Sequence, residues 1–365
     1  MDATRIRGPL ALAGWLIAIV LIALPARAGD VVQRTAAGAP VPIGILGDSD
    51  SHSYQDELLS TTRFGRFRPV TFQWPEALAR LRPTQLDLGA WGERGTRRSV
   101  AELMDWVGLG GRFPRKQDYL HNLAFAGATC GSLMGYDGRL ARRMAATMDR
   151  DPGKWRLGGV VIIALGVNDF GHANSLDLLV ENPAAPQVQA KIAGCLEQIR
   201  QAVALIRTSY PATRFVLVGI LGDVDDPSNL THWRSANAIR NINIGFDLFD
   251  NGLKAMAAAD PRIAFAPLRP WFAQHWGSRD EQGQPNYKSV TIGDFVVSHS
   301  AGDDPKNCAT ADEHSGVAWN ALWAQSLVAL MNARFDLGIA PISDAEVAEF
   351  LRPAIEASRR TDSGG

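Results

Sequence analysis

The stretch VPIGILGDS at residues 41–49 is a short, almost wholly apolar run that ends in Gly-Asp-Ser. A run of this length, bounded by turn residues, is typical of a buried strand that leads into a loop. Similar runs stand at residues 160–165 (VVIIAL) and 215–220 (FVLVGI), with a weaker one at 263–266. Segments with helical spacing separate them. This alternation predicts an α/β fold with a mostly parallel sheet and helices on both faces.

Helices are expected where apolar residues recur at intervals of three and four. The segments with this pattern are 74–81, 132–148, 188–208, 235–258, 316–333 and 343–360. Residues 86–119 are irregular and rich in glycine and arginine, which predicts an insertion or a long loop. We therefore expect one domain over residues 41–340. A peripheral helix and a disordered tail should follow within residues 341–365.

The composition is that of a globular protein with a large core, because 46% of the 365 residues are hydrophobic and 21% are charged. The formal net charge is -1. Since there is no basic excess to neutralise phosphates, no nucleic-acid partner is expected.

The first residues have the layout of a secretory signal peptide, predicted to cover residues 1–28. Arg5 and Arg7 precede an apolar run at residues 9–24, and an A-x-A cleavage pattern follows at residues 26–28. The alternative is an uncleaved membrane anchor, because the run is close to the lower limit for spanning a bilayer. Cleavage is favoured, and no second long apolar run follows. These features predict a periplasmic or secreted protein with no membrane span after cleavage.

Four short blocks carry the residue types of nucleophilic catalysis. Ser49 follows the first strand, where a strand-end turn exposes a hydroxyl. Gly127 lies in the block at residues 122–129, and glycine lets a backbone N–H approach an oxyanion closely. Asn168 follows the second strand in Gly-Val-Asn-Asp, with a carboxamide suited to donating to an oxyanion. His314 precedes the last core helix and is the side-chain type best suited to move protons near neutral pH.

Each block alone has a structural explanation, as a turn, a helix cap or a surface histidine. Together, and in this order, they resemble the Ser, Gly, Asn and His blocks of SGNH hydrolases, also called GDSL esterases. Gly-Asp-Ser-x-Ser and Gly-x-Asn-Asp match in full, and residues 122–129 are similar to the family's Asn-x-Ala-x-x-Gly-Ala-Thr. The resemblance spans about residues 42–333. It implies a three-layer α/β/α sandwich like that of flavodoxin, and no cofactor.

The resemblance also implies the roles of the site residues. Ser49 would be the nucleophile and His314 its base. The oxyanion hole would consist of the Ser49 N–H, the Gly127 N–H and the Asn168 side chain. No Cys-x-x-Cys or His-rich spacing suggests a metal site.

The acid of the triad is where the sequence departs from the family. The family has an Asp three residues before the His, and that position is Ala311. Asp312 is our candidate for the acid, because it is able to orient the His314 imidazole if the loop is rearranged. The alternatives are a backbone carbonyl, Asp303 or Asp304.

Two further acids adjoin the blocks. Asp48 and Asp169 are interpreted as structural, with Asp169 holding the Ser49 loop through backbone N–H groups. The other six histidines, at positions 52, 121, 172, 232, 275 and 299, have no setting comparable to that of His314.

Three cysteines leave at least one thiol unpaired in a monomer. Cys195 lies in a helical pattern and is expected to pack in the core. Cys130 stands three residues after Gly127, and Cys308 six before His314. If both blocks converge on one site, a Cys130–Cys308 disulfide is one candidate, and two unpaired thiols are the other. Sequence alone does not settle disulfide geometry.

The favoured function is that of an exported serine ester hydrolase that works through an acyl-enzyme, with a short acyl or carbohydrate ester as substrate. One alternative is a cell-envelope glycan O-acyltransferase, which would use the same residues. The other is a non-catalytic binding protein on the same fold, for which Ala311 is the main support. Acyl length, the alcohol and the oligomeric state stay open.

Overall fold

The computed structural model describes residues 38–362 except positions 60–61, 108 and 137. The predicted signal peptide at residues 1–28 lies outside the described residues, as do the last three residues of the predicted tail. Within the described part of the chain, no helix combines the length and the apolar character needed to cross a membrane.

A five-stranded sheet forms the centre of the fold, and every neighbouring pair in it is parallel. Its strands are β1 (Val41–Gly47), β2 (Leu86–Asp87), β5 (Val160–Ala164), β6 (Arg214–Val218) and β7 (Ile263–Ala266). β1, β5 and β6 are buried almost throughout, as their continuous apolar sequences require. The four predicted strands are confirmed, and the fold is the expected α/β class.

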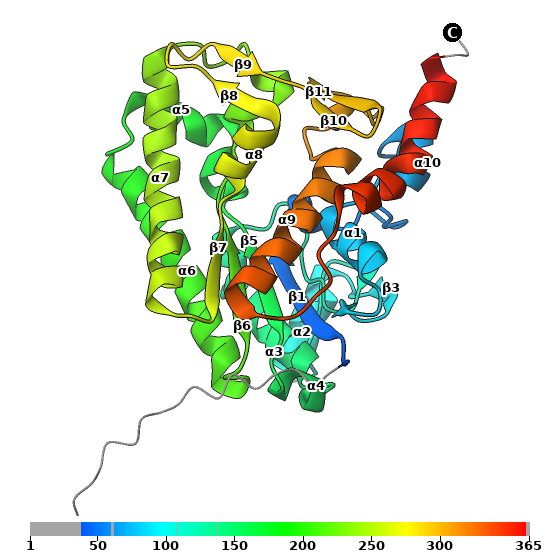
Figure 1. The fold of residues 1–365 in the computed structure, drawn as a ribbon. Helices are drawn as coiled ribbons and strands as arrows, with labels where there is room; N and C mark the ends of the chain where they lie inside the picture. The colour runs from blue at the N-terminus through cyan, green and yellow to red at the C-terminus, as the bar shows by residue number, and fades with distance from the viewer. Residues whose placement is uncertain (1–37, 60–61, 108, 137, 363–365) are drawn as a thin grey trace, which may run out of the picture. The chain divides into compact units, whose positions relative to one another are not determined.

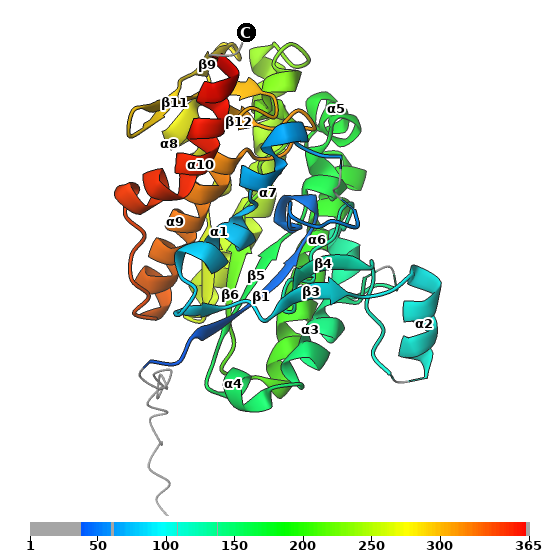
Figure 2. The same ribbon diagram turned by 90° about the vertical axis from the view of Figure 1, so that its right-hand side faces the viewer.

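Helices cover both faces of this sheet (Figure 2). One face carries α1 (Trp74–Leu81), α8 (Leu268–Trp276), α9 (Val317–Phe335) and α10 (Asp344–Asp362). The other carries α3 (Leu140–Met148), α4 (Pro152–Arg156), α5 (Ala173–Glu181), α6 (Pro186–Ser209) and α7 (Ala236–Ala259). Each face has its own apolar core, so the sheet is the middle layer of a three-layer α/β/α sandwich.

The strand order β2-β1-β5-β6-β7 creates a switch point between β1 and β5. From β1 the chain moves to one edge for β2, then returns to the other side of β1 for β5. The loops after β1 and β5 therefore diverge, and ligands of open α/β sheets bind in the crevice between such loops. This is the flavodoxin-like order, and Ser49 and Asn168 follow the two strands that flank the switch point.

The segment 86–119 is more regular than the expected loop. It contains the sheet strand β2, a hairpin of β3 (Trp91–Arg94) and β4 (Lys116–Tyr119), and α2 (Arg98–Trp106). β2 has only two residues, and its pairing with β1 makes it a strand. The expected helix at 132–148 is also shorter. A 3₁₀ helix, Cys130–Leu133, comes first, and α3 begins only after two glycines.

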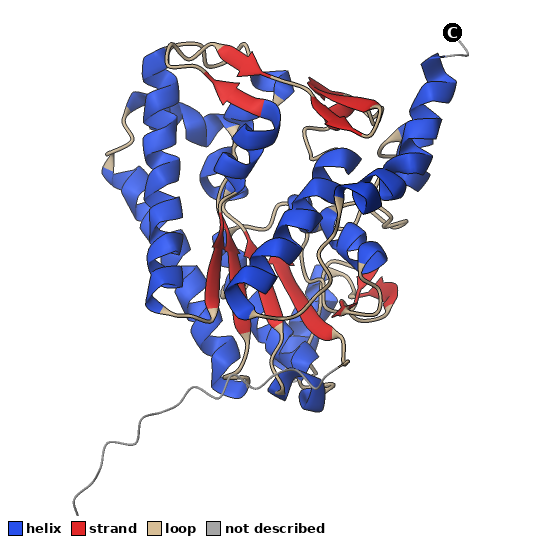
Figure 3. Ribbon diagram, viewed as in Figure 1, coloured by secondary structure: helices blue, strands red, loops and turns tan. Residues whose placement is uncertain are grey.

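Small sheets follow α8 and lie near the carboxyl ends of the central strands (Figures 1 and 3). They comprise β8 (Gly277–Arg279) with β9 (Pro285–Tyr287), and β10 (Val290–Ile292) with β11 (Phe295–Ala301) and β12 (Asn307–Ala309). Arg279 donates to the carbonyl of Val224, and a His299 ring nitrogen lies 2.9 Å from the carbonyl of Asp225. These contacts hold the loop after β6.

The disulfide joins Cys130 to Cys195, and Cys308 is free and buried. A Cys130–Cys308 pair is therefore wrong, and Cys195 is bonded as well as packed. Cys130 and Cys195 lie in the core on the α6 face of the sheet, whereas Cys308 lies in the core on the α9 face. These two thiols cannot meet, because the sheet separates them.

Candidate active site

A cavity of about 250 Å³ lies at the carboxyl ends of the central strands. Its wall includes Ser49 after β1, Ala164 at the end of β5, Val218 at the end of β6 and Leu268 after β7. His314 and Asp312, from the loop before α9, also line it. The structure thus brings the predicted nucleophile, base and acid to one cavity at the switch point.

The Ser49 turn has a local explanation in its own sequence. The Asp48 carboxylate accepts the N–H of Asp50 at 3.0 Å and caps the 3₁₀ helix Ser49–Ser51. Asp48 itself is buried, and burial raises the pKa of its carboxyl well above its usual range. A Cβ on Gly47 would lie 2.7 Å from the Cβ of Ser51, so only glycine fits there.

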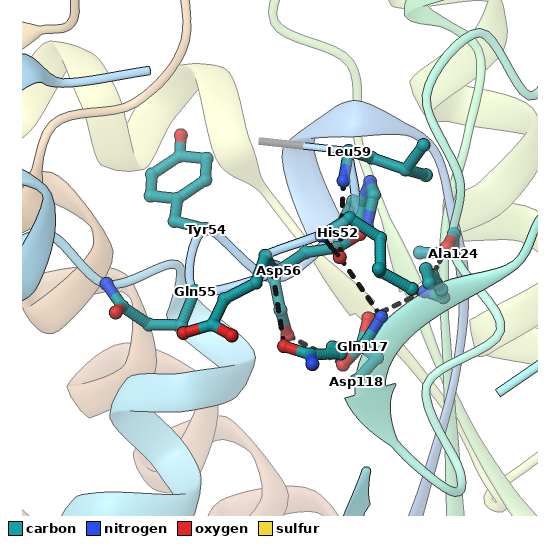
Figure 4. A network of polar contacts seen from close by, with 12 residues as sticks. His52, Tyr54, Gln55, Asp56, Leu59, Gln117, Asp118 and Ala124 are labelled. Atoms are coloured by element: carbon teal, nitrogen blue, oxygen red, sulfur yellow. Dashed lines mark hydrogen bonds and ion pairs between the residues drawn. The ribbon is translucent and has the colours of Figure 1, made fainter. Parts of the chain in front are cut away.

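A buried polar network supports the chain just after this turn (Figure 4). A ring nitrogen of His52 lies 2.9 Å from the carboxylate of Asp56, which also accepts the N–H of Gln117 at 3.1 Å. Ser53 donates to Asp118 at 2.6 Å. Each of these contacts ties the loop after Ser49 to β4 or to itself.

Lys116 lies at the centre of this network. Its ammonium donates to Asp118 at 2.6 Å and to the carbonyl of Ala124, and its side chain is 1% exposed. Ala124 belongs to the block that contains Gly127. One buried cation therefore connects the loop after Ser49 to the second block.

The second block runs beside β1. Leu123 donates its N–H to the Ile45 carbonyl, and the Asn122 side chain donates to the Ser51 carbonyl at 2.8 Å. Gly127 has a φ of +79°, a conformation that favours glycine, and it is exposed. Among the described residues, its N–H has no hydrogen-bond acceptor. The block therefore offers an N–H that is free to bind an oxyanion.

Asn168 lies in the turn Val167–Gly171, directly after β5. Its carboxamide donates to the Ala128 carbonyl at 2.9 Å, which fixes which side of the amide is nitrogen. Its oxygen then faces a ring nitrogen of His172 at 3.0 Å. The other ring nitrogen of His172 lies 3.1 Å from the Asp223 carboxylate. Both contacts are satisfied at once when His172 is protonated and donates twice.

His172 lines the cavity and contacts a predicted site residue, so the interpretation that it has no special setting is wrong. The hydrogen bond to Asp223 is the main cause that raises the pKa of His172. The spacing of four residues between Asn168 and His172 was the available sequence signal.

Asp169 accepts the N–H of Cys130 at 2.9 Å. This contact ties the turn after β5 to the residue that directly follows the second block, three positions after Gly127. The prediction was that Asp169 holds the Ser49 loop through backbone N–H groups. The backbone N–H that it accepts in this contact belongs to Cys130.

His314 is held by the loop that contains Asp312. The Nδ1 of His314 lies 2.7 Å from the backbone carbonyl of Asp312 and 3.5 Å from its carboxylate. That carboxylate accepts hydrogen bonds from Arg63 at 2.5 Å and Thr310 at 2.6 Å. Two of the candidates for the group that orients His314, the Asp312 carboxylate and a backbone carbonyl, thus belong to the same residue. The carbonyl is the closer of the two to Nδ1.

The other candidate acids have different partners. Asp303 accepts the N–H of Ala311, and Asp304 accepts from Lys306 and Ser358.

The surroundings of the His314 imidazole change the pKa of both His314 and Asp312. Burial opposes ionisation of Asp312, but hydrogen bonds from His314, Arg63 and Thr310 outweigh it and hold the pKa of that carboxyl well below its usual range. Burial alone would lower the pKa of His314, but the hydrogen bond to Asp312 and the charge of Asp50 raise it above its ordinary value.

The wall of the cavity divides into an apolar part and an acidic part. The apolar side chains are Trp74, Ala164, Val167, Val218, Leu221, Leu268, Trp319 and Trp323. The acidic ones are Asp50, Asp223, Asp225, Asp226, Asp312 and Glu313. Three of the tryptophans thus line the cavity, and two of them, Trp74 and Trp323, also belong to the core on the α9 face. Trp233, Trp271 and Trp276 are buried in the two cores and do not line the cavity.

Within the described residues, one group of side chains has the spacing of a metal site: Cys130, Cys195 and Asp169. The disulfide joins the two cysteines, so neither is available as a thiolate ligand.

The GDSL-like Lipase/Acylhydrolase family matches residues 87–287, which is more than half of the chain. The chain belongs to this family. It is accordingly a hydrolase of carboxylic esters. The family match includes Gly127 and Asn168 of this GDSL-like hydrolase and ends before His314, while Ser49 precedes it.

Among solved structures, the GDSL-like hydrolase is similar to a chain described as a Clostridium thermocellum family 3 carbohydrate esterase. The two share 12% sequence identity at a TM-score of 0.38, over 82% of this chain and 100% of that chain. A comparison with curated proteins found no match.

Proposed function

We propose that this GDSL-like hydrolase cleaves its ester through an acyl-enzyme on Ser49, with His314 as the base. The observation that carries the proposal is that both residues line one cavity at the switch point, with the Nδ1 of His314 fixed 2.7 Å from the Asp312 carbonyl. This contact selects the tautomer with the proton on Nδ1, which leaves Nε2 free to accept the serine proton. His314 then returns the proton to the leaving alcohol and later activates water.

The oxyanion of each tetrahedral intermediate is proposed to bind the N–H of Ser49, the N–H of Gly127 and the carboxamide of Asn168. Three contacts support this assignment. Asn122 holds the second block to Ser51, Asp169 holds it to the turn after β5, and Asn168 itself bonds Ala128. The donors are thereby fixed before the substrate binds, which is the condition for strong stabilisation of the transition state.

Replacing Asp312 by Asn is expected to lower kcat/KM by at most about 100-fold, less than the roughly 10⁴-fold lost when a reference triad loses its acid. The reason is that the backbone carbonyl, at 2.7 Å, still holds Nδ1. The ascending limb of the pH profile should move to lower pH, because Asp312 helps to raise the pKa of His314. Steady-state kinetics across pH test both points.

Asp303→Asn is the matched control, because Asp303 bonds the same loop without contacting His314. A loss near 10⁴-fold in Asp312→Asn alone would mean that the carboxylate, not the carbonyl, orients the imidazole.

His172 is proposed as a positioning residue that holds Asn168 in its protonated form. As pH rises through the raised pKa of His172, one of its two donors is lost, and kcat/KM should fall. His172→Gln keeps a donor that does not titrate, so this descending limb should disappear while activity at the optimum stays within about tenfold. Identical pH profiles for the two proteins would rule out the role.

The substrate is proposed to be a neutral ester with a short acyl chain, such as an acetylated sugar. A cavity of about 250 Å³ suits a short acyl chain better than a long one, and its acidic side chains disfavour anionic alcohols. Export to the periplasm or medium is part of the proposal, supported by the signal-peptide pattern and by a disulfide of the kind found in oxidising compartments.

A panel of p-nitrophenyl esters from acetate to palmitate, with acetylated glucose and acetylated glucuronate, tests this substrate class. We expect kcat/KM to be highest for acetate and for the neutral sugar, with a preference over glucuronate that shrinks in high salt. A preference for palmitate, or for the anionic sugar, would contradict the proposal. An acylated glycan as the main product in the presence of a glycan acceptor would indicate acyl transfer instead.

A further inference from the structure

A second cavity, of about 530 Å³, lies between the β3–α2 segment and α3, and it has a strongly basic wall. Six arginines line it: Arg94, Arg112, Arg139, Arg142, Arg143 and Arg150. Four of them come from α3 and its flanks, at the spacing that puts side chains on one face of a helix. The others come from β3 and from the loop that follows α2, so arginines from three segments line the cavity. Figure 2 shows the ribbon of α2, α3 and β3 in this part of the molecule.

The acids present do not balance these charges. Among the described residues that line the cavity, only Glu93 and Asp105 are acidic, and Glu93 pairs with Arg115. Asp105 lies 3.5 Å from Arg139 and 3.4 Å from Arg143. Across the described part of the chain, none of the other four lining arginines forms a salt bridge. The cavity therefore carries an excess of fixed positive charge.

Arg143 gives the clearest sign that a partner is missing. Its side chain is 6% exposed, and its Nε and Nη1 have no hydrogen-bond partner among the residues that the structure describes. The guanidinium lies over the ring of Phe113, 4.6 Å from the centroid. Leaving such donors buried and unpaired costs free energy that an anion in the cavity would recover.

Arg112 shows the same excess from the other wall. Burial and the charges of neighbouring arginines together lower its pKa to about 10, although the charge of Asp118 acts in the opposite direction. Its guanidinium donates to the carbonyls of Leu120 and Asn122, so it is anchored in the chain and still adds charge to the cavity.

We propose that this cavity binds a small phosphorylated molecule, at a site separate from the ester-cleaving cavity. Guanidinium groups bind phosphate oxygens through paired, charge-assisted hydrogen bonds. A tetrahedral phosphate accepts such bonds from several directions, which suits arginines that converge from three segments. The volume falls in the range for a bound small molecule and exceeds what one inorganic ion needs.

The test is calorimetric titration of the full chain with pyrophosphate at constant ionic strength, with citrate as a carboxylate probe. Arg142 and Arg150 are exposed, so Arg142→Gln/Arg150→Gln should fold normally, and its activity on a neutral ester should be unchanged. We expect pyrophosphate to bind the wild type and to bind this variant at least about tenfold more weakly. Arg200→Gln/Arg240→Gln, with two exposed arginines that do not line the cavity, is the matched control and should bind like the wild type.

A second experiment separates a soluble ligand from a lipid headgroup. Vesicles of phosphatidylcholine with phosphatidic acid are sedimented with the wild type and with the double variant. If the wild type sediments with the vesicles and the double variant does not, the phosphate belongs to a lipid. If the wild type stays in the supernatant, the phosphate belongs to a soluble ligand. The proposal is overturned if pyrophosphate does not bind the wild type, if citrate binds more tightly, or if both double variants lose binding equally.

Discussion

Ser49→Ala is expected to fold like the wild type and to lose roughly 10⁴- to 10⁶-fold in kcat/KM. The side chain is only partly buried, and its loss leaves the capped turn of Asp48 in place. His314→Ala should lose a similar amount. The double variant should be little worse than either single one, because a nucleophile and its base act as a unit. Steady-state kinetics on p-nitrophenyl acetate measure all three.

Ser51→Ala is the matched control in the same turn. The Ser51 hydroxyl is buried and has no hydrogen-bond partner within the described part of the chain, so its removal should change kcat/KM by less than about tenfold. A fluorophosphonate probe, followed by peptide mapping, gives an independent readout. Label on Ser49 in the wild type, and none in His314→Ala, is the expected pattern. Normal turnover in Ser49→Ala would end the proposal that this serine is the nucleophile.

Lys116→Met is expected to destabilise the protein by about 3–5 kcal/mol, because it leaves the Asp118 carboxylate buried without its cation. Both side chains are almost fully buried, and the lysine also donates to the carbonyl of Ala124. Activity should fall as well, because this contact connects the loop after Ser49 to the second block. Urea unfolding measures the change in the free energy of unfolding.

Lys154→Met removes the same side chain from a partly exposed ion pair with Asp87, and it should cost no more than about 1 kcal/mol. Lys116→Met/Asp118→Leu should recover part of the stability, because no charge is left unpaired. Equal, small losses in Lys116→Met and Lys154→Met would contradict a structural role for the buried pair.

The central fold was predictable because strands buried on both faces have continuous apolar sequences. β1, β5 and β6 could be identified in this way. β2 could not, because a two-residue strand is defined by its pairing with β1 and not by a pattern of its own. The hairpin of β8 and β9 has two short strands with few apolar residues, and contacts distant in sequence decide it.

The sequence blocks led to three residues that line the cavity, Ser49, Asp312 and His314, whereas Gly127 and Asn168 are not among the lining residues. Site residues that lie outside the blocks could not be found in this way. His172 depends on Asp223, 51 residues further along the chain, and the Asp312 carboxylate depends on Arg63, 249 residues before it. The disulfide prediction was wrong for a related reason. Cys130 and Cys308 follow and precede different blocks, and the two cysteines lie on opposite faces of the sheet.

The Cys130–Cys195 bond closes a loop of 65 residues that contains β5 and Asn168. In the unfolded chain such a cross-link removes conformational entropy equivalent to about 4 kcal/mol. That is a large share of the free energy of unfolding of a typical domain, which is roughly 5–15 kcal/mol. The same sequence made where thiols stay reduced would fold without that contribution. The margin by which this enzyme stays folded is therefore set by the redox state of its surroundings as well as by its packing.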